Sequence, residues 1–190
     1  HTQRRRQRQM CIRDSVDAHT DTYRGDGNQD YMRYNVATTF TRAAEEGLID
    51  AKASLHIGPR GPTMDNSVFE HTRDVGFQLI DGDDLFEIGL FKTADILVEQ
   101  LKDRTVYLCF DMDFFDPSCA PGVCTPTWGG ATAREGLGFL RKLKGLNIVG
   151  ADINTVSPPH DVGGMTAFLA GAVALEILTL FCYAQNLVPK

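Results

Sequence analysis

The chain has 190 residues, 43% hydrophobic and 23% charged, which is the composition of one globular domain. Its net charge of -6 argues against nucleic acid as the main partner, because phosphate-binding surfaces are usually basic. The five cysteines follow no disulfide spacing and no secretory signal precedes them, so we expect reduced thiols and a cytoplasmic protein.

Residues 1–15 differ in charge from the rest of the chain. They hold five of the 19 basic residues and one acid, Asp14, so the remaining residues carry a net charge of -10. A basic arm of this kind either binds nucleic acid or is an unrelated sequence joined to the domain. We favour the second interpretation, because a hydrophobic strand is expected before Val16, and we place the domain at residues 16–190.

Strands and helices are predicted to alternate after this arm. Apolar runs rich in β-branched residues predict strands at residues 53–57, 75–80, 106–110 and 148–153. Helical periodicity predicts helices at residues 38–46, 65–74, 93–102 and 132–144. The pattern indicates an α/β fold, a mainly parallel sheet covered by helices on both faces in three layers.

The last element is an apolar helix at residues 165–182, which is long enough to cross a membrane. Glu176 lies inside it, and Thr166 and Thr179 interrupt it. We therefore expect a buried helix of a soluble domain, with no membrane as partner.

Two short motifs carry the candidate chemistry. Asp17, His19 and Asp21 alternate in an extended segment, which places their side chains on one face. Asp111 and Asp113 directly follow a predicted strand with the same spacing. In a parallel sheet both motifs would meet at the carboxyl ends of the strands, where ligands bind.

Four carboxylates and an imidazole at one edge would repel one another unless cations neutralise the carboxylates. Oxygen-rich ligation with an imidazole suits Mn(II), with iron, cobalt or nickel as alternatives. Two ions with bridging carboxylates would hold a bridging hydroxide at neutral pH, a nucleophile that needs no serine or cysteine. Each motif by itself is also compatible with a solvated turn, a helix cap or a magnesium site.

The segment from Asp111 to Gly130, DMDFFDPSCAPGVCTPTWGG, resembles the signature of the ureohydrolases, the arginase and agmatinase family. VDAHTDT from Val16 resembles the other metal motif of that family, and DINTVSPPHD from Asp152 resembles its late segment. The Ser-Pro-Pro sequence at Ser157 is nearer to the agmatinase-like branch. The three motifs occur in family order.

The resemblance implies a three-layer arginase-like fold and hydrolysis of a guanidino compound to urea and an amine by two Mn(II) ions, with Ni(II) as the alternative. It implies small cationic substrates and a homo-oligomer, a trimer or a hexamer. Asp152 would support the metal site from behind. The expected metal ligands are Asp17, His19, Asp21, Asp111 and Asp113, and Asp21 would also orient the hydroxide as the catalytic residue.

Three departures from the family pattern bear on activity. The Gly-Gly-Asp-His segment that supplies a further ligand is absent, so we expect an N-terminally truncated, inactive chain. Val36 stands where many members have a histidine that shuttles protons, and Thr155 stands where many have a glutamate that holds the guanidinium. A hydroxyl cannot make the bidentate, charge-assisted pair of a glutamate.

The candidate substrate contacts are Thr155, Trp128, whose ring would stack on a guanidinium, and His160. Trp128 is equally compatible with packing and His160 with simple exposure. The leading hypothesis is an agmatinase-like hydrolase of agmatine or a guanidino acid. The alternatives are a guanidine hydrolase, a non-catalytic relative and a deacetylase-like enzyme with one zinc ion.

Overall fold

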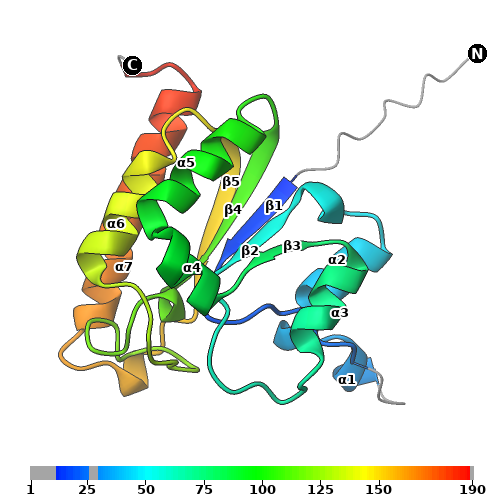
Figure 1. Ribbon diagram of the computed structural model, residues 1–190. Coiled ribbons are helices and arrows are strands. Elements are labelled where there is room, and N and C mark those ends of the chain that lie inside the picture. Colours follow the sequence, from blue (N-terminus) through cyan, green and yellow to red (C-terminus); the bar gives the residue numbers. More distant parts are fainter. Residues whose placement is uncertain (1–11, 26–29, 189–190) are drawn as a thin grey trace, which may run out of the picture.

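The computed structural model describes residues 12–25 and 30–188, and five parallel strands form one sheet in the order β3-β2-β1-β4-β5 (Figure 1). The strands are β1 (Ile12–Val16), β2 (Leu55–Ile57), β3 (Gln78–Ile80), β4 (Thr105–Asp111) and β5 (Asn147–Asn154). The predicted α/β fold with a parallel sheet and flanking helices is confirmed.

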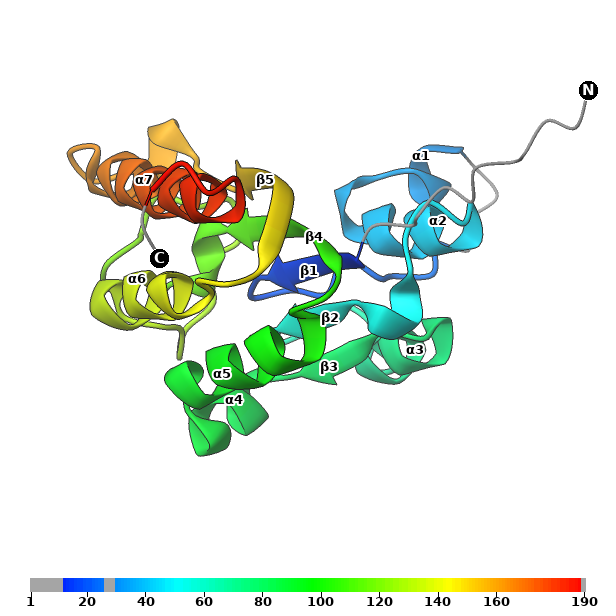
Figure 2. The ribbon, with the colours of Figure 1, turned by 90° about the horizontal axis from the view of Figure 1, so that it is seen from above.

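Seven α-helices are found in the described residues. They are α1 (Asp30–Arg33), α2 (Thr39–Glu45), α3 (Val68–Val75), α4 (Gly82–Ile88), α5 (Leu90–Leu101), α6 (Ala133–Lys142) and α7 (Met165–Ala184). Helices α4 and α5 lie on one side of the sheet and α1 and α2 on the other (Figure 2). Local sequence fixes some helix starts: Thr132 and Glu135 form a capping box at α6, and Asp81 caps α4.

Strand β1 occupies the centre of the sheet and begins at Ile12. Residues 12–15 therefore belong to the folded domain, whereas the charge pattern had placed its boundary at Val16. The periodicity gave no strand here because Arg13, Asp14 and Ser15 are polar, although Asp14 and Ser15 are buried. The rest of the predicted basic arm, residues 1–11, lies outside the described residues.

The main core lies between the sheet and helices α4, α5, α6 and α7. Aromatic rings dominate it near the ends of the strands: Phe110 and Phe114 pack edge to face with centroids 5.7 Å apart. Phe114 also contacts Phe115 and Phe139. This packing fixes the end of β4, which carries Asp111, and the turn that follows it, which carries Asp113.

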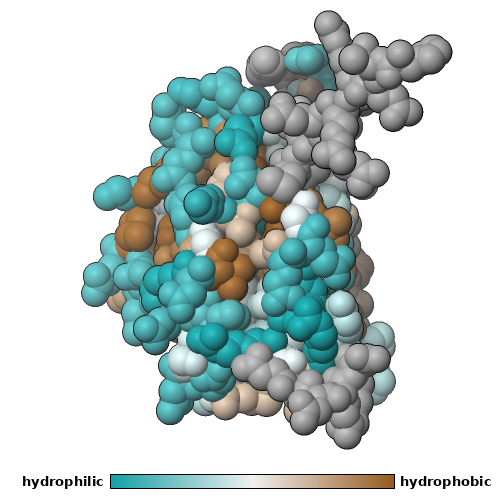
Figure 3. Space-filling model, turned by 90° about the vertical axis from the view of Figure 1, so that its right-hand side faces the viewer, coloured by the Kyte–Doolittle hydropathy of each residue, from teal (hydrophilic) through white to brown (hydrophobic). Residues whose placement is uncertain are grey.

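Helix α7 is only partly buried. It packs against α6 and β5, but just 22% of its most apolar 18-residue stretch is buried, and Phe168 is 83% exposed. By length and composition it is also long and apolar enough to cross a membrane. The expectation of a buried helix is therefore wrong for its outer side, because no described residue covers that side. The face formed by α2 and α3 is, by contrast, mainly hydrophilic, with a few separate apolar residues (Figure 3).

Candidate metal centre

The two acidic motifs meet where β1 and β4 end. These strands are parallel neighbours with Val16 opposite Phe110, so the residues that follow each strand lie at the same edge of the sheet. Asp17, Asp111 and Asp113 are buried there, while His19 and Asp21 are half-buried. Burial of three carboxylates at one edge is unfavourable without compensating cations.

The ligand atoms form two triads that share Asp17. In one triad, atoms of Asp17, His19 and Asp113 all lie within 4.8 Å of one another, and in the other those of Asp17, Asp21 and Asp111 do. Carboxylate oxygens with one imidazole are the donor set expected for Mn(II) and similar cations. Two groups that could each hold a cation therefore share Asp17.

Hydrogen bonds orient the first triad. The backbone N–H of His19 donates to Asp17 Oδ1 over 2.8 Å, and that of Ala18 donates to Asp113 Oδ1 over 3.2 Å. His19 Nδ1 lies 3.4 Å from both Asp17 Oδ1 and Asp113 Oδ2, and the Thr125 hydroxyl donates to Asp113 Oδ2. The His19 ring is therefore held by the two carboxylates with which it would share an ion.

The second triad, of Asp17, Asp21 and Asp111, includes an atom that lacks a hydrogen-bond partner in the described part of the chain. Asp111 Oδ1 is buried and has no hydrogen-bond partner in the described residues. Asp21 lies at a positive φ of 50°, in the left-handed region that few non-glycine residues adopt. A buried carboxylate oxygen without a partner is costly, and such a backbone conformation concentrates at functional sites. Both features fit a cation bound by Asp17, Asp21 and Asp111.

Burial and mutual repulsion shift the pKa values of most of these acids upward. Burial first, and then the neighbouring negative charges, raise the pKa of Asp17 well above its ordinary value, that of Asp21 to about 7 and that of Asp111 to about 6. Burial also opposes ionisation of Asp113, but hydrogen bonds from His19 keep its pKa below the ordinary value. The cluster thus holds protons that divalent cations would displace on binding.

The surroundings of His19 favour its charged form, whereas they disfavour the charged forms of Asp17, Asp21 and Asp111. Burial disfavours its charged form, but the hydrogen bonds and charges of Asp113 and Asp17 outweigh burial and raise its pKa to about 10. Without metal, the imidazolium of His19 is the cation that neutralises this pair of carboxylates. A metal ion would take its place, and the ring would then be a neutral ligand.

A third group, Cys109, Asp111 and Asp152, has a similar spacing but a different character. The side-chain amide of Asn154 donates to Asp152 Oδ1 over 2.6 Å and to Cys109 Sγ over 3.7 Å. Arg13 adds a hydrogen bond to Asp152 Oδ2 over 3.3 Å. Donors already occupy Asp152 and Cys109, whereas Asp111 Oδ1, unpartnered within the described residues, belongs to a residue that is also in the triad with Asp17 and Asp21.

The structure places the other predicted site residues at different distances from the centre. Thr155 Oγ1 accepts the backbone N–H of Asp113 and so touches a candidate metal ligand. Asp152 lies beside Asp111. Trp128 is 74% exposed at the surface, and His160 Nδ1 lies 2.7 Å from Ser157 Oγ. Within the described residues, the side chains of Trp128 and His160 form no hydrogen bond or ion pair with the acids.

No sequence pattern marked Arg60 as a residue of the candidate metal centre. Arg60 follows β2 in a Gly-Pro-Arg-Gly-Pro segment and donates to the backbone carbonyl of Asp113 over 2.8 Å. Apart from the nearby Gly58, its acceptors are carbonyl oxygens of segments distant in sequence, which no local pattern marks. A glycine- and proline-rich loop predicts a turn and nothing about what its arginine binds.

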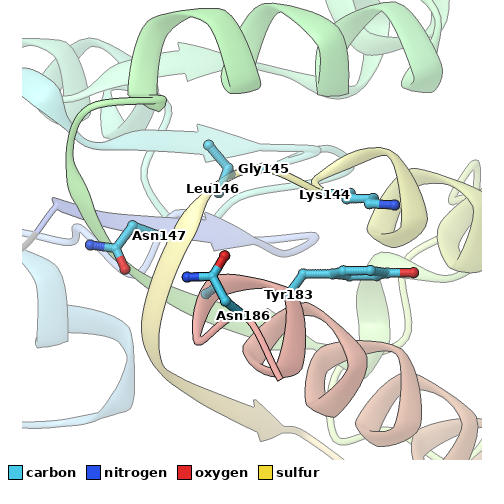
Figure 4. Close-up of a pocket in the computed structure, with 7 residues that line it drawn as sticks. Lys144, Gly145, Leu146, Asn147, Tyr183 and Asn186 are labelled. Carbon is cyan, nitrogen blue, oxygen red and sulfur yellow. The ribbon is translucent and has the colours of Figure 1, made fainter. Parts of the chain in front are cut away.

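A cavity of about 410 Å³ lies elsewhere, at the amino end of β5. Asn147 and Asn186 lie on one side of it and Lys144 and Tyr183 on the other (Figure 4). The carboxylates lie at the opposite, carboxyl ends of the strands. This cavity is therefore separate from the candidate metal centre.

The sequence matches known proteins over most of its length. The model of the family described as the Arginase family matches residues 8–180. The chain is 37% identical to proclavaminate amidinohydrolase of Streptomyces clavuligerus, covering 90% of this chain and 54% of that protein. It is 41% identical to agmatinase of Photorhabdus laumondii, covering 86% and 49%, and 38% identical to guanidinopropionase of Pseudomonas aeruginosa, covering 86% and 51%.

Solved structures of similarly named proteins also superpose on this chain. Proclavaminate amidinohydrolase of Streptomyces clavuligerus superposes with a TM-score of 0.82 at 36% identity, covering 92% of this chain and 56% of that one. A hypothetical agmatinase of Burkholderia thailandensis gives 0.78 at 33% identity, covering 91% and 51%. The chain spans about half the length of the curated relatives it matches.

Proposed function

The chain belongs to the arginase family, and we propose from this that its full-length protein hydrolyses agmatine or a guanidino acid to urea and an amine. Relatives named agmatinase and guanidinopropionase support this substrate class, because both names denote guanidino compounds. A linear guanidinium cation would also suit a chain with a net charge of -6.

The observation that carries the proposal is the pair of triads that share Asp17. Asp17, His19 and Asp113 would hold one divalent cation, and Asp17, Asp21 and Asp111 the other. Mn(II) is the proposed metal and Ni(II) the alternative. When bound, two such ions lower the pKa of a water between them and supply hydroxide at neutral pH.

The protein's own groups would orient the reaction and move its protons. Asp21 is half-buried, and burial with the charge of Asp111 raises its pKa to about 7. Asp21 is the proposed catalytic residue, because its carboxylate would bind an ion and would also accept a hydrogen bond that orients the hydroxide. Asp152, held by Arg13 and Asn154, would support Asp111 from behind.

The proposed substrate contacts are Thr155, Trp128 and His160. Thr155 is next to Asp113, and its neutral hydroxyl already accepts a hydrogen bond. Guanidine itself is the second candidate substrate, because it could lie against Thr155 and Trp128 without a pocket for a long tail. The alternative that is not an enzyme is a non-catalytic relative, which would bind metal or partners without turnover.

The chain of 190 residues is proposed to be inactive by itself. Within the described residues, the triad of Asp17, Asp21 and Asp111 contains no imidazole, so its ion would have few ligands. We also propose a cytoplasmic homo-oligomer, a trimer or a hexamer, that uses neither nucleic acid nor a membrane.

Urea release tests the proposal. The full-length protein is loaded separately with Mn(II) and Ni(II) and assayed with agmatine, guanidinobutyrate, guanidinopropionate, arginine and guanidine. Urea from one of them, lost in Asp113→Ala, is the expected result. Absence of urea with all five, although two metal ions are bound, would overturn the proposal in favour of a non-catalytic relative.

A further inference from the structure

Arg60 joins three segments that lie around the candidate metal centre. Its backbone N–H donates to the carbonyl of Ala18, between Asp17 and His19, over 2.9 Å. Its side-chain NH2 group donates to the carbonyl of Asp113 over 2.8 Å. The loop that follows β2 thus contacts both metal-binding motifs.

The same guanidinium also holds the loop that carries Trp128. Its NH2 group donates to the carbonyl of Thr127 over 2.8 Å, and its Nε donates to that of Trp128 over 3.2 Å. Its other NH group donates to Gly58 over 3.2 Å. Arginine suits this position because its rigid planar group presents five donors, whereas lysine has one nitrogen that cannot reach all these carbonyls.

The partners of Arg60 set it apart from five other arginines of the chain. Arg13, Arg33, Arg42, Arg104 and Arg141 each form an ion pair with a carboxylate. In the described part of the chain no carboxylate oxygen lies within 4.0 Å of the Arg60 guanidinium, and all its hydrogen-bond acceptors there are backbone carbonyls. Its role is therefore to fix backbone positions.

Resting on the proposed function, we propose that Arg60 is a positioning residue for this centre. It fixes the backbone of Asp113, and through it the carboxylate that completes the triad with Asp17 and His19, relative to the loop that carries Trp128. Loss of Arg60 should therefore weaken the ion of this triad more than the ion of the other triad. It should also raise KM for the guanidino substrate more than it lowers kcat.

Metal affinity is the first readout. Mn(II) binding to the full-length protein is measured by titration calorimetry, with thermal melting of the metal-free protein in parallel. In Arg60→Met one of the two ions should bind about tenfold to hundredfold more weakly, as after loss of other groups that orient ligands. Arg60→Lys should recover only part of this affinity. Arg104→Met, which removes a surface ion pair with Asp50, is the matched control and should bind both ions normally.

A second variant displaces Arg60 without removing its charge. A Cβ added at Gly82 would lie 2.7 Å from Cβ of Arg60, and the three nearest atoms all belong to Arg60. Gly82→Ala should therefore shift the arginine stem and weaken the same ion in the same direction, by less than Arg60→Met. This variant keeps the test valid if Arg60→Met does not fold.

The outcomes separate this proposal from the proposed function. Selective weakening of one ion in Arg60→Met or Gly82→Ala supports the positioning role, whether or not the wild type releases urea. Normal binding of both ions, or equal weakening of both together with a lower melting temperature, would overturn it. Urea release by the wild type would still support the proposed function in that case.

Discussion

The hydroxyl oxygen of Thr155 accepts a hydrogen bond from the backbone N–H of Asp113 over 3.3 Å. Thr155 adopts this position at a positive φ of 67°, which is unusual for a β-branched residue. Its carbonyl accepts the backbone N–H of Cys124, which ties it to the segment after β4. The residue at this position is thus held beside the candidate metal centre at a conformational cost.

A glutamate at position 155 should therefore reach the guanidinium of agmatine. In the full-length protein we expect Thr155→Glu to lower KM for agmatine about tenfold relative to Thr155→Gln, which corresponds to about 1.4 kcal/mol of binding free energy. Thr155→Gln is the matched control because it has the same size without the charge. Equal KM values for the two variants would show that the substrate does not bind against residue 155.

The shared position of Asp17 predicts an asymmetry between ligand variants. Asp17→Asn should weaken both metal ions, because Asp17 belongs to both triads, whereas Asp21→Asn should weaken only one. Since loss of groups behind a ligand costs about tenfold to hundredfold, loss of a ligand should cost at least about a hundredfold for each affected ion. Calorimetric titration with Mn(II) measures both affinities. A loss confined to one ion in Asp17→Asn would contradict the two-triad arrangement.

The periodic part of the fold was predictable from sequence, and the centre of the sheet was not. Strands β4 and β5 and helices α5 and α6 were predicted to within a few residues, because apolar periodicity reports burial directly. Strand β1 has a charged residue at Arg13 and another at Asp14, so its pattern reads as polar. Its place is fixed by pairing with β2 and β4 on both sides.

The acidic motifs were predictable because alternate carboxylates after a strand are a local pattern, and the structure brings them to one edge of the sheet. Arg60 and Asn154 were not, because their partners come from other segments and only the folded chain brings them together. The exposed side of α7 was also missed, because composition alone cannot tell which side of an apolar helix is covered.

His56 predicts a loss of stability in acid. It is buried edge to face between Phe40 and Phe77, and burial, with the charge of Arg13, lowers its pKa to about 3. The unfolded chain takes up the proton near pH 6.5 and the folded one does not, so stability falls as the pH drops from about 6.5 to about 3. The full effect is about 5 kcal/mol.

In His56→Phe this dependence should disappear. Urea denaturation of the metal-free chain at pH 7 and pH 4.5 measures it, and the variant should lose less stability than the wild type between the two. His160→Ala, which changes an exposed histidine, is the control and should behave as the wild type. An unchanged pH dependence in His56→Phe would refute the assignment.

Asp14 has the opposite effect on the pH dependence of stability. Burial raises its pKa to about 7, although its carboxylate accepts the backbone N–H of Leu55. The folded state then holds a proton that the unfolded state releases near pH 3.8, so stability falls as the pH rises from about 4 to about 7. Asp14→Asn keeps an acceptor and removes the charge, and it should stabilise the chain by about 4 kcal/mol at pH 8 and little at pH 4. The exposed substitution Asp103→Asn is the control, and denaturation curves at both pH values decide the matter.

The outer side of α7 predicts association of the isolated chain. Phe168, Leu175 and Leu178 are exposed on it, and β5, at the edge of the sheet beside it, has no second partner strand in the described residues. An apolar helix side next to a free strand edge is the type of surface that proteins cover.

The double substitution Phe168→Lys and Leu175→Lys should therefore reduce the apparent mass in sedimentation velocity. Phe86→Lys changes an equally exposed aromatic residue on α4 and should leave the mass unchanged. A wild-type chain that sediments as a monomer at all concentrations would show that α7 does not mediate association, and binding to lipid vesicles would instead favour a membrane as its partner.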